Sequence, residues 1–481
     1  MMDTPAELSA VEARRQIGTR ELTPSALLEA CIARIEERNP RVNAVVATNF
    51  DEARKQAKIA DETVQAGHAL PPLHGLPVLI KDLSRTKGLR TTFGSRCFET
   101  HVPDHDDIIV ERLRTAGAIV LGKTNTPEFG AGANTSNLVF GATGNPYNVT
   151  LTSGGSSGGS AAGLASNMAP LASGSDLGGS LRIPASFCGI VGMRPSPGIV
   201  ASRSHVSGFS HLWTDGPMAR SVDDLMLMLT AISGFDARDP LCSPNLDIGH
   251  ADLHAIEDLA HSRIGFSTDL GVAEVDSEIA ALFKARQPII SKHFNTTVAL
   301  DVDLSDAAEV FRVLRAESLY AAYGELAENQ PDMIGQNVRN NILEAKSLTL
   351  ADTARADAAH TQIYRRFQAI FNEVDYLICP ATSVSPFPLA DNHPEAINDK
   401  PLKEYYAWYA ITWALSLTGS PVVTLPCGLD NQGMPFGIQI VGPRHSDAKL
   451  LRFARGLETA LIQDGLGRTL PEFGASDTAS A

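Results

Sequence analysis

The sequence predicts an α/β protein: one large domain with a mixed β-sheet core that is covered by helices on both faces. Short, bounded apolar runs alternate with stretches of helical periodicity along most of the chain. The composition, 43% apolar and 20% charged over 481 residues, is typical of a globular protein with a sizeable core. Because no linker-like segment separates the elements, we expect one unit over residues 1–475 and a flexible tail over 476–481.

The first 66 residues predict a helical segment that packs on this domain. Thr23 can cap a helix, Pro24 suits its first position, and the apolar residues that follow fall on one face. Asn39 and Pro40 are expected to end this helix. A second, more charged helix is expected over 51–66.

Five apolar runs predict strands of the sheet. In chain order they read LPVLIKD, AIVLGKTN, VDYLICP, SPVVTLPCG and FGIQIVG, and the first places Lys81 at its end. Helical periodicity appears over 109–116, over 447–462, and over most of the region from about 250 to 370.

Charge and cysteine usage exclude several functions. The 55 acidic residues outnumber 40 basic ones, giving a net charge of −15, and no basic patch is visible. We therefore expect no nucleic-acid and no membrane partner. The six cysteines lie far apart without a CxxC pair, which indicates reduced thiols in a cytoplasmic protein. Metal and nucleotide motifs such as HExxH and GxGxxG are missing, so we expect no metal and no cofactor.

The stretch TSGGSSGGSAAG, residues 152–163, has three possible interpretations. Glycine-serine runs are often flexible linkers, but this one is followed by a helix-forming run and by a second such loop, SGSDLGGSLRIPASFCG. The stretch also satisfies G-x-S-x-G, the nucleophile elbow of α/β-hydrolases, with Ser156 as nucleophile. That interpretation needs a histidine base, and His393 and His445 both lie in polar contexts typical of surface histidines.

The third interpretation is a resemblance to the amidase signature family. The block GGSSGGSAAGLASNMAPLASGSDLGGSLRIPASFCGIVGMRP resembles the pattern of that family, and so do LHGLPVLIKDL, GKTNTPEFG, GATGNPYN, TDGPMARSVDDL and GMPFGIQIVG. The resemblance covers nearly the whole chain and is weakest between about 240 and 410. It implies the amidase signature fold and hydrolysis of the C–N bond of linear amides.

The resemblance also implies a catalytic triad. Lys81 is the base, Ser156 is the serine preceded by a cis peptide bond, and Ser180 is the nucleophile. A lysine accepts a proton only when neutral, so its pKa must fall from about 10.4 toward neutrality, and burial at a strand end has that effect. The alternative for Lys81 is a simple ion pair with Asp82.

The second glycine-serine loop supplies the remaining candidates. Its backbone N–H groups can converge on one oxygen and form an oxyanion hole; the candidates are Leu177, Gly178, Gly179 and Ser180. By resemblance, supporting contacts come from Ser157, Asp176 and Arg182, although a surface ion pair is an equal alternative for the last two. Outside this loop, the resemblance implies Phe129, Gly130 and Ser156 as substrate-binding residues, with core packing as an alternative for Phe129.

The expected activity is hydrolysis of small aryl or aliphatic amides, and of esters or carbamates, through an acyl-enzyme. The aromatic run YYAWYAITWAL is expected to pack in the core or to form a wall for an apolar substrate. Two alternatives stay open: the glutaminase subunit of a glutamyl-tRNA amidotransferase, and an esterase that uses Ser156. The expected partner is a small-molecule amide, and the sequence is compatible with a homodimer without fixing the oligomeric state.

Overall fold

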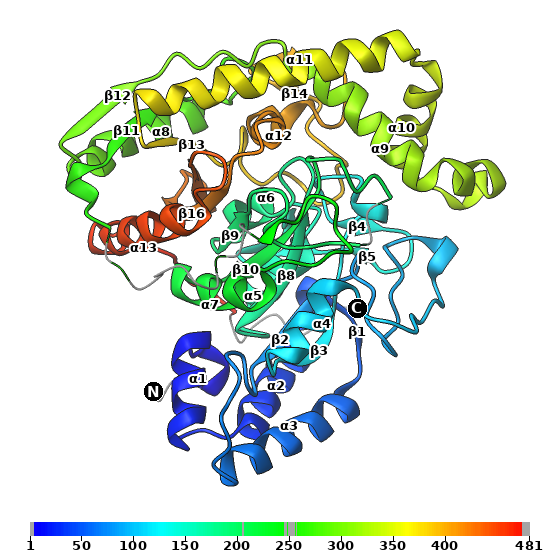
Figure 1. Ribbon diagram of the computed structural model, residues 1–481, viewed down its shortest axis with the longest axis vertical. Helices are drawn as coiled ribbons and strands as arrows, with labels where there is room; N and C mark the ends of the chain where they lie inside the picture. Colours follow the sequence, from blue (N-terminus) through cyan, green and yellow to red (C-terminus); the bar gives the residue numbers. More distant parts are fainter. Residues whose placement is uncertain (1–3, 204–205, 245–247, 249–254, 256, 474–481) are drawn as a thin grey trace.

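The computed structural model describes residues 4–203, 206–244, 248, 255 and 257–473, which form an α/β fold around a large mixed sheet (Figure 1). The sheet has eleven strands in the order β1-β3-β2-β8-β10-β9-β16-β17-β13-β11-β12. Its strands are β1 (Val45–Thr48), β2 (Pro77–Lys81), β3 (Ile119–Thr124), β8 (Leu171–Asp176), β9 (Val191–Arg194), β10 (Thr214–Ala219), β11 (Arg263–Phe266), β12 (Thr296–Ala299), β13 (Tyr376–Pro380), β16 (Val422–Leu429) and β17 (Pro435–Val441).

Helices cover both faces of this sheet, as the sequence predicts. They are α1 (Ala10–Thr19), α2 (Pro24–Val42), α3 (Phe50–Gln65), α4 (Ile108–Thr115), α5 (Gly158–Ala165), α6 (Arg182–Phe187), α7 (Val222–Ile232), α8 (Ser277–Ser291), α9 (Ala307–Asn329), α10 (Gln336–Ser347), α11 (Leu350–Ala369), α12 (Ala410–Leu417) and α13 (Asp447–Gln463). In Figure 1 the N-terminal helices α1–α3 lie at one end of the molecule and α9–α11 at the other. Within the described residues, no helix has the length and apolar character needed to cross a bilayer.

The remaining strands are short and lie outside the main sheet. They pair as three small hairpins: β4 (Ser136–Asn137) with β5 (Gly141–Ala142), β6 (Gly144–Asn145) with β7 (Asn148–Thr152), and β14 (Ala396–Ile397) with β15 (Lys400–Pro401). The predicted tail, 476–481, lies outside the described residues.

One expectation about an individual element was wrong. Helix α2 runs through Pro40 to Val42, because Asn43 ends it in a left-handed conformation with φ 51°. The side chain of Asn39 accepts the N–H groups of Ala44 and Val45, each at 2.8 Å, and so holds the chain just beyond the helix end. The expectation that the region from about 250 to 370 is mostly helical is confirmed by α8 to α11, and the region also contains the unpredicted strands β11 and β12.

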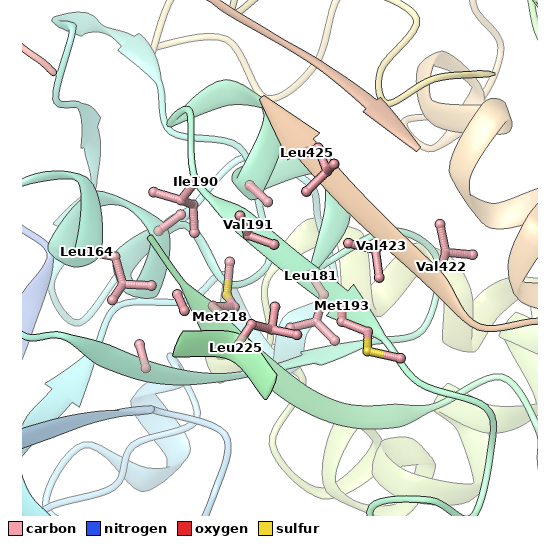
Figure 2. Close-up of a cluster of buried hydrophobic side chains, with 14 of the residues drawn as sticks. Leu164, Leu181, Ile190, Val191, Met193, Met218, Leu225, Val422, Val423 and Leu425 are labelled. Carbon is pink, nitrogen blue, oxygen red and sulfur yellow. The ribbon is translucent and has the colours of Figure 1, made fainter. Parts of the chain in front are cut away.

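A continuous apolar core fixes the centre of the sheet. Figure 2 shows part of it, in which side chains from α5, α7, β9, β10, β16 and two adjoining turns gather; the labelled residues are Leu164, Leu181, Ile190, Val191, Met193, Met218, Leu225, Val422, Val423 and Leu425. All ten are fully or almost fully buried. Burial of such side chains contributes about 1.5–3 kcal/mol each. This core anchors β8, β10 and the turn after β8, where the candidate functional residues lie.

Candidate functional site

The two glycine-serine loops lie against each other at the end of β8. The N–H of Ser157 donates to the carbonyl of Ser180 at 3.3 Å, and the Ser157 hydroxyl donates to the carbonyl of Ser175, also at 3.3 Å. The peptide bond between Gly155 and Ser156 is cis. Since residues 152–163 are buried throughout, the interpretation of this stretch as a flexible linker is wrong.

Lys81 ends β2 and is 1% exposed. Its Nζ donates to Ser156 Oγ at 2.7 Å, to Ser175 Oγ at 2.9 Å and to the Ser175 carbonyl at 3.3 Å. Burial lowers the pKa of Lys81 to about 7, although the carboxylates of Asp176 and Asp215 act to raise it. An amine with such a pKa is partly neutral at neutral pH and can then accept a proton.

The neighbouring carboxylate of Asp82 pairs with Lys123 and not with Lys81. It accepts the N–H and hydroxyl of Thr92, at 3.0 and 2.6 Å, and lies 3.9 Å from Nζ of Lys123. Consecutive side chains at a strand end point to opposite sides, so Lys81 and Asp82 are directed apart. The alternative of a Lys81–Asp82 ion pair is therefore wrong.

Ser180 lies between β8 and α6 and is half-buried. It lines a small cavity together with Gly130, Leu177, Gly178 and others. A Cβ built on Gly130 would come within 3.3 Å of Ser156 Oγ, so the Ser156 hydroxyl lies beside the same glycine. The structure thus joins Lys81 to Ser156 by a hydrogen bond and places Ser180 at the cavity next to them. Within the described residues it has no hydrogen bond between the two serine hydroxyls.

Asp176 and Arg182 form a fully buried ion pair. Arg182 Nη2 lies 3.0 Å from Asp176 Oδ1, and both side chains are 0% exposed. Arg194 of β9 approaches the same oxygen at 3.3 Å. Burial acts to raise the pKa of Asp176, but the two guanidinium groups hold it well below its usual range. The alternative of a surface ion pair is therefore wrong, and Arg194 is a partner that the sequence patterns did not single out.

This carboxylate also shapes the loop that follows it. It accepts the N–H of Gly179 at 2.8 Å and that of Leu181 at 3.0 Å. The Gly179 N–H is therefore engaged, contrary to its expected place among the oxyanion donors. The N–H groups of Leu177, Gly178 and Ser180 have no acceptor within the described part of the chain, and all three residues line the cavity.

An aromatic cavity adjoins the small cavity. Phe129 is 1% exposed, its ring stacks on Tyr323 with centroids 4.0 Å apart, and it meets Phe98 edge-on at 6.1 Å. The residues Phe129, Trp213 and Leu319 line both cavities. Phe129 therefore packs in a local cluster and also presents a surface to the site, so its two interpretations are compatible.

The aromatic run near residue 410 divides between core and site. Trp408 is 1% exposed and stacks on Phe187, and Trp413 stacks on Phe311. Tyr409 instead lines the small cavity with Ser180. The run therefore supplies both a packed core and one wall of the site.

Neither histidine proposed for an esterase triad contacts Ser156. A ring nitrogen of His393 lies 2.8 Å from the carbonyl of Pro394, and the backbone N–H of His445 donates to Ser196. Lys81 is the side chain that hydrogen-bonds Ser156 among the described residues. This arrangement does not support the nucleophile-elbow alternative.

Comparison with known proteins agrees with this geometry. The Amidase family profile matches residues 26–451. The chain is 32% identical to an acylamidase from Rhodococcus erythropolis over 453 residues, covering 94% of this chain and 95% of the relative. It is 35% identical to a subunit of the glutamyl-tRNA(Gln) amidotransferase from Prochlorococcus marinus (strain MIT 9303), covering 93% of this chain and 96% of that relative.

Solved structures give the same assignment. A bacterial aryl acylamidase of the amidase signature enzymes superimposes with a TM-score of 0.85 at 28% identity, over 96% of this chain and 99% of its own. A 6-aminohexanoate cyclic dimer hydrolase with bound substrate superimposes with a TM-score of 0.83 at 26% identity, over 97% and 100%. With the family profile matching most of the sequence, the chain belongs to the amidase signature family and is a hydrolase of amide C–N bonds.

Proposed function

We propose that the protein hydrolyses small aryl or aliphatic amides, with Ser180 as nucleophile and with Ser156 and Lys81 as its proton relay. The observation that carries this proposal is the 2.7 Å hydrogen bond between Lys81 Nζ and Ser156 Oγ, made by a buried amine. A neutral amine can accept the Ser156 proton along the same line, and a hydroxyl can donate and accept at once.

The reaction has two steps. Ser180 Oγ bonds to the amide carbon and passes its proton to Ser156, whose own proton moves to Lys81. The negative oxygen that forms is stabilised by the free N–H groups of Leu177, Gly178 and Ser180; one such donor is typically worth about 3 kcal/mol in the transition state. The C–N bond then breaks as the relay returns a proton to the amine. Water then bonds to the acyl carbon and gives a proton to the relay, and the bond to Ser180 Oγ breaks as the relay returns a proton to that oxygen, which releases the acid.

The aromatic cavity supports an aryl or other apolar group on the substrate. Its walls include Phe93, Phe98, Phe129, Trp213 and Tyr323, and flat rings in such a cavity bind another ring through offset or edge contacts. The test is release of 4-nitroaniline from 4-nitroacetanilide by the purified chain, with Ser180→Ala as the inactive control. Matched esters and carbamates of 4-nitrophenol would define the range of leaving groups.

A second candidate is the glutaminase subunit of a glutamyl-tRNA amidotransferase. Relatives that belong to such an amidotransferase are as similar to this chain as the acylamidase is. This candidate predicts hydrolysis of glutamine and a requirement for partner proteins. Efficient anilide hydrolysis by the isolated chain, with no activity on glutamine, would exclude it.

A further inference from the structure

Arg315 of α9 is a buried cation at the small cavity. It is 4% exposed and lines this cavity with Ser180, Gly178 and Tyr409. The guanidinium group stays protonated at all ordinary pH values. Burial of a charge is costly, so proteins usually pair such a group with an opposite charge.

No carboxylate of the described residues forms an ion pair with Arg315. Its Nη2 donates to the hydroxyl of Tyr405, and its Nε is buried without a hydrogen-bond partner. The other contacts are aromatic: the guanidinium carbon lies 5.2 Å from the ring centroid of Tyr405 and 5.8 Å from that of Phe311. Such rings stabilise a cation but leave its net charge uncompensated.

The other buried arginines of the site have a carboxylate partner, although Nε of Arg194 also lacks a hydrogen-bond partner among the described residues. Arg182 and Arg194 both have the Asp176 carboxylate within 3.3 Å. Arg315 instead donates to the hydroxyl of Tyr405, and this hydroxyl also accepts a 2.7 Å hydrogen bond from Asn341. The two bonds to one hydroxyl hold the guanidinium group in position. The group is thus fixed and partly unsatisfied beside the cavity that contains the candidate nucleophile.

We propose that Arg315 binds a carboxylate on the acyl part of the substrate, so that the preferred substrates are N-substituted monoamides of dicarboxylic acids. This inference rests on the proposed function of the same site. Guanidinium and carboxylate groups match in charge and in paired hydrogen-bond geometry. Tyr409 lines the same cavity, and its phenol is a further hydrogen-bond donor on this side of the site.

The two cavities differ in their access to solvent, and this difference indicates which half of such a substrate each one binds. The amine must leave before water attacks the acyl-enzyme, so it needs an exit to solvent. The aromatic cavity offers one, because Val206 on its wall is 69% exposed. The small cavity contains Ser180 and is walled by buried residues, including Leu177 and Arg315, so we assign the acyl group, which stays bonded to Ser180, to this side.

The test compares 4-nitroanilides that differ only in the end of the acyl chain. The mono-4-nitroanilides of malonic, succinic and glutaric acid are matched with the neutral anilides of propionic, butyric and valeric acid. A charge-assisted contact predicts that kcat/KM for at least one acidic anilide exceeds that of its neutral match by about tenfold or more. A preference for the neutral anilide in every pair would overturn the inference and leave amide hydrolysis intact. Failure to hydrolyse any anilide would instead count against the proposed function itself.

Two variants test whether the preference for acidic anilides depends on Arg315. In Arg315→Met the acidic-to-neutral ratio of kcat/KM should fall by about tenfold or more. Arg312→Met is the matched control, because it removes the same charge one turn away on α9, where Arg312 pairs with Glu309 and the side chain is 28% exposed. The control should keep the ratio, and an equal fall in both variants would contradict a specific contact.

A measurement on the unmodified chain covers the case in which Arg315→Met does not fold. Succinate should compete with the anilides about tenfold more strongly than butyrate, because only succinate carries a second carboxylate. Equal inhibition by the two acids would overturn the inference.

Discussion

Nζ of Lys81 lies 2.7 Å from Oγ of Ser156. Lys81 is the last residue of β2, which pairs in parallel with β8. Ser175 of β8 holds the amine from another direction through its hydroxyl and carbonyl. The amine is therefore fixed in position by backbone and side chain together. Its reactivity follows from burial, which removes the water that would stabilise its charged form.

Lys81→Met should lower kcat by at least about a hundredfold, because general base catalysis of this kind contributes about 10²–10⁴ in rate. Methionine keeps the length and apolar stem of the side chain, so the fold should persist. The measurement is anilide turnover between pH 6 and 10, with circular dichroism to verify folding. A variant with full activity at neutral pH would rule out Lys81 as the base.

Ser180→Ala should abolish both turnover and covalent labelling by a fluorophosphonate. Ser156→Ala should lose turnover but keep Ser180 as the site of any slow labelling, since the relay and not the nucleophile is removed. Mass spectrometry of the labelled peptide distinguishes the two serines. A label on Ser156 that survives in Ser180→Ala would support the nucleophile-elbow alternative.

The pH dependence should follow the protonation of Lys81. Because only the neutral amine acts as base, kcat/KM should rise as the pH increases through about 7, the pKa that burial gives this group. Asp215 lies opposite Ser175 in the register of β10 and β8, and its carboxylate acts to raise that pKa. Burial raises the pKa of Asp215 itself to about 7, so it loses its charge over the same range as Lys81 gains one. Asp215→Asn removes that carboxylate at every pH and should therefore move the acidic limb of the profile to lower pH. A shift in the opposite direction would contradict the assignment of Lys81 to this limb.

Gly130→Ala should reduce activity by about tenfold or more through steric contact at the site. The new Cβ would lie 2.9 Å from Leu83 Cδ1 and 3.3 Å from Ser156 Oγ, and φ at Gly130 is +73°. Gly88→Ala is the matched control, with φ +74° and no atom within 4 Å of its Cβ. Both variants carry the same conformational cost of about 1–2 kcal/mol, but the control should keep its kcat/KM.

Asp176→Asn should destabilise the protein by about 3–5 kcal/mol, because it leaves Arg182 and Arg194 buried without their counter-charge. Denaturant unfolding measures this loss. Glu328→Gln, which removes an exposed pair with Lys346, serves as the comparison and should cost at most about 1 kcal/mol. Similar losses in the two variants would show that the buried pair has no special role in stability.

The sequence predicted five of the eleven strands of the sheet, because these strands are buried on both faces and appear as continuous apolar runs. β2, β3, β13, β16 and β17 all fall where such runs occur. The central strands β8, β9 and β10 contain glycine and polar residues and did not stand out as such runs. β11 and β12 were missed because each has only four residues, and all residues of β12 are exposed, so neither produces an apolar run. Their pairing depends on a neighbouring strand, β13, that lies far along the chain.

The site residues that lie within recognisable sequence motifs could be predicted. The glycine-serine loops and the end of LPVLIKD located Ser156, Ser180 and Lys81 through the family resemblance. Arg315 and Tyr409 come from the region between 240 and 410 where that resemblance is weakest. Helical periodicity places Arg315 on a helix but does not show what its side chain meets, since this depends on how α9 packs on α12.

Because of the buried cluster around Asp176, the protein should lose activity at a higher pH than the pH at which it unfolds. As the pH falls below about 7 the amine of Lys81 takes up a proton, and kcat/KM should fall with the neutral fraction of that amine. The carboxyl of Asp176 ionises well below its usual range, so the loop that it braces keeps its ion pairs as the solution becomes mildly acidic. Mild acid should therefore inactivate the enzyme without unfolding it, and full activity should return when the solution is neutralised.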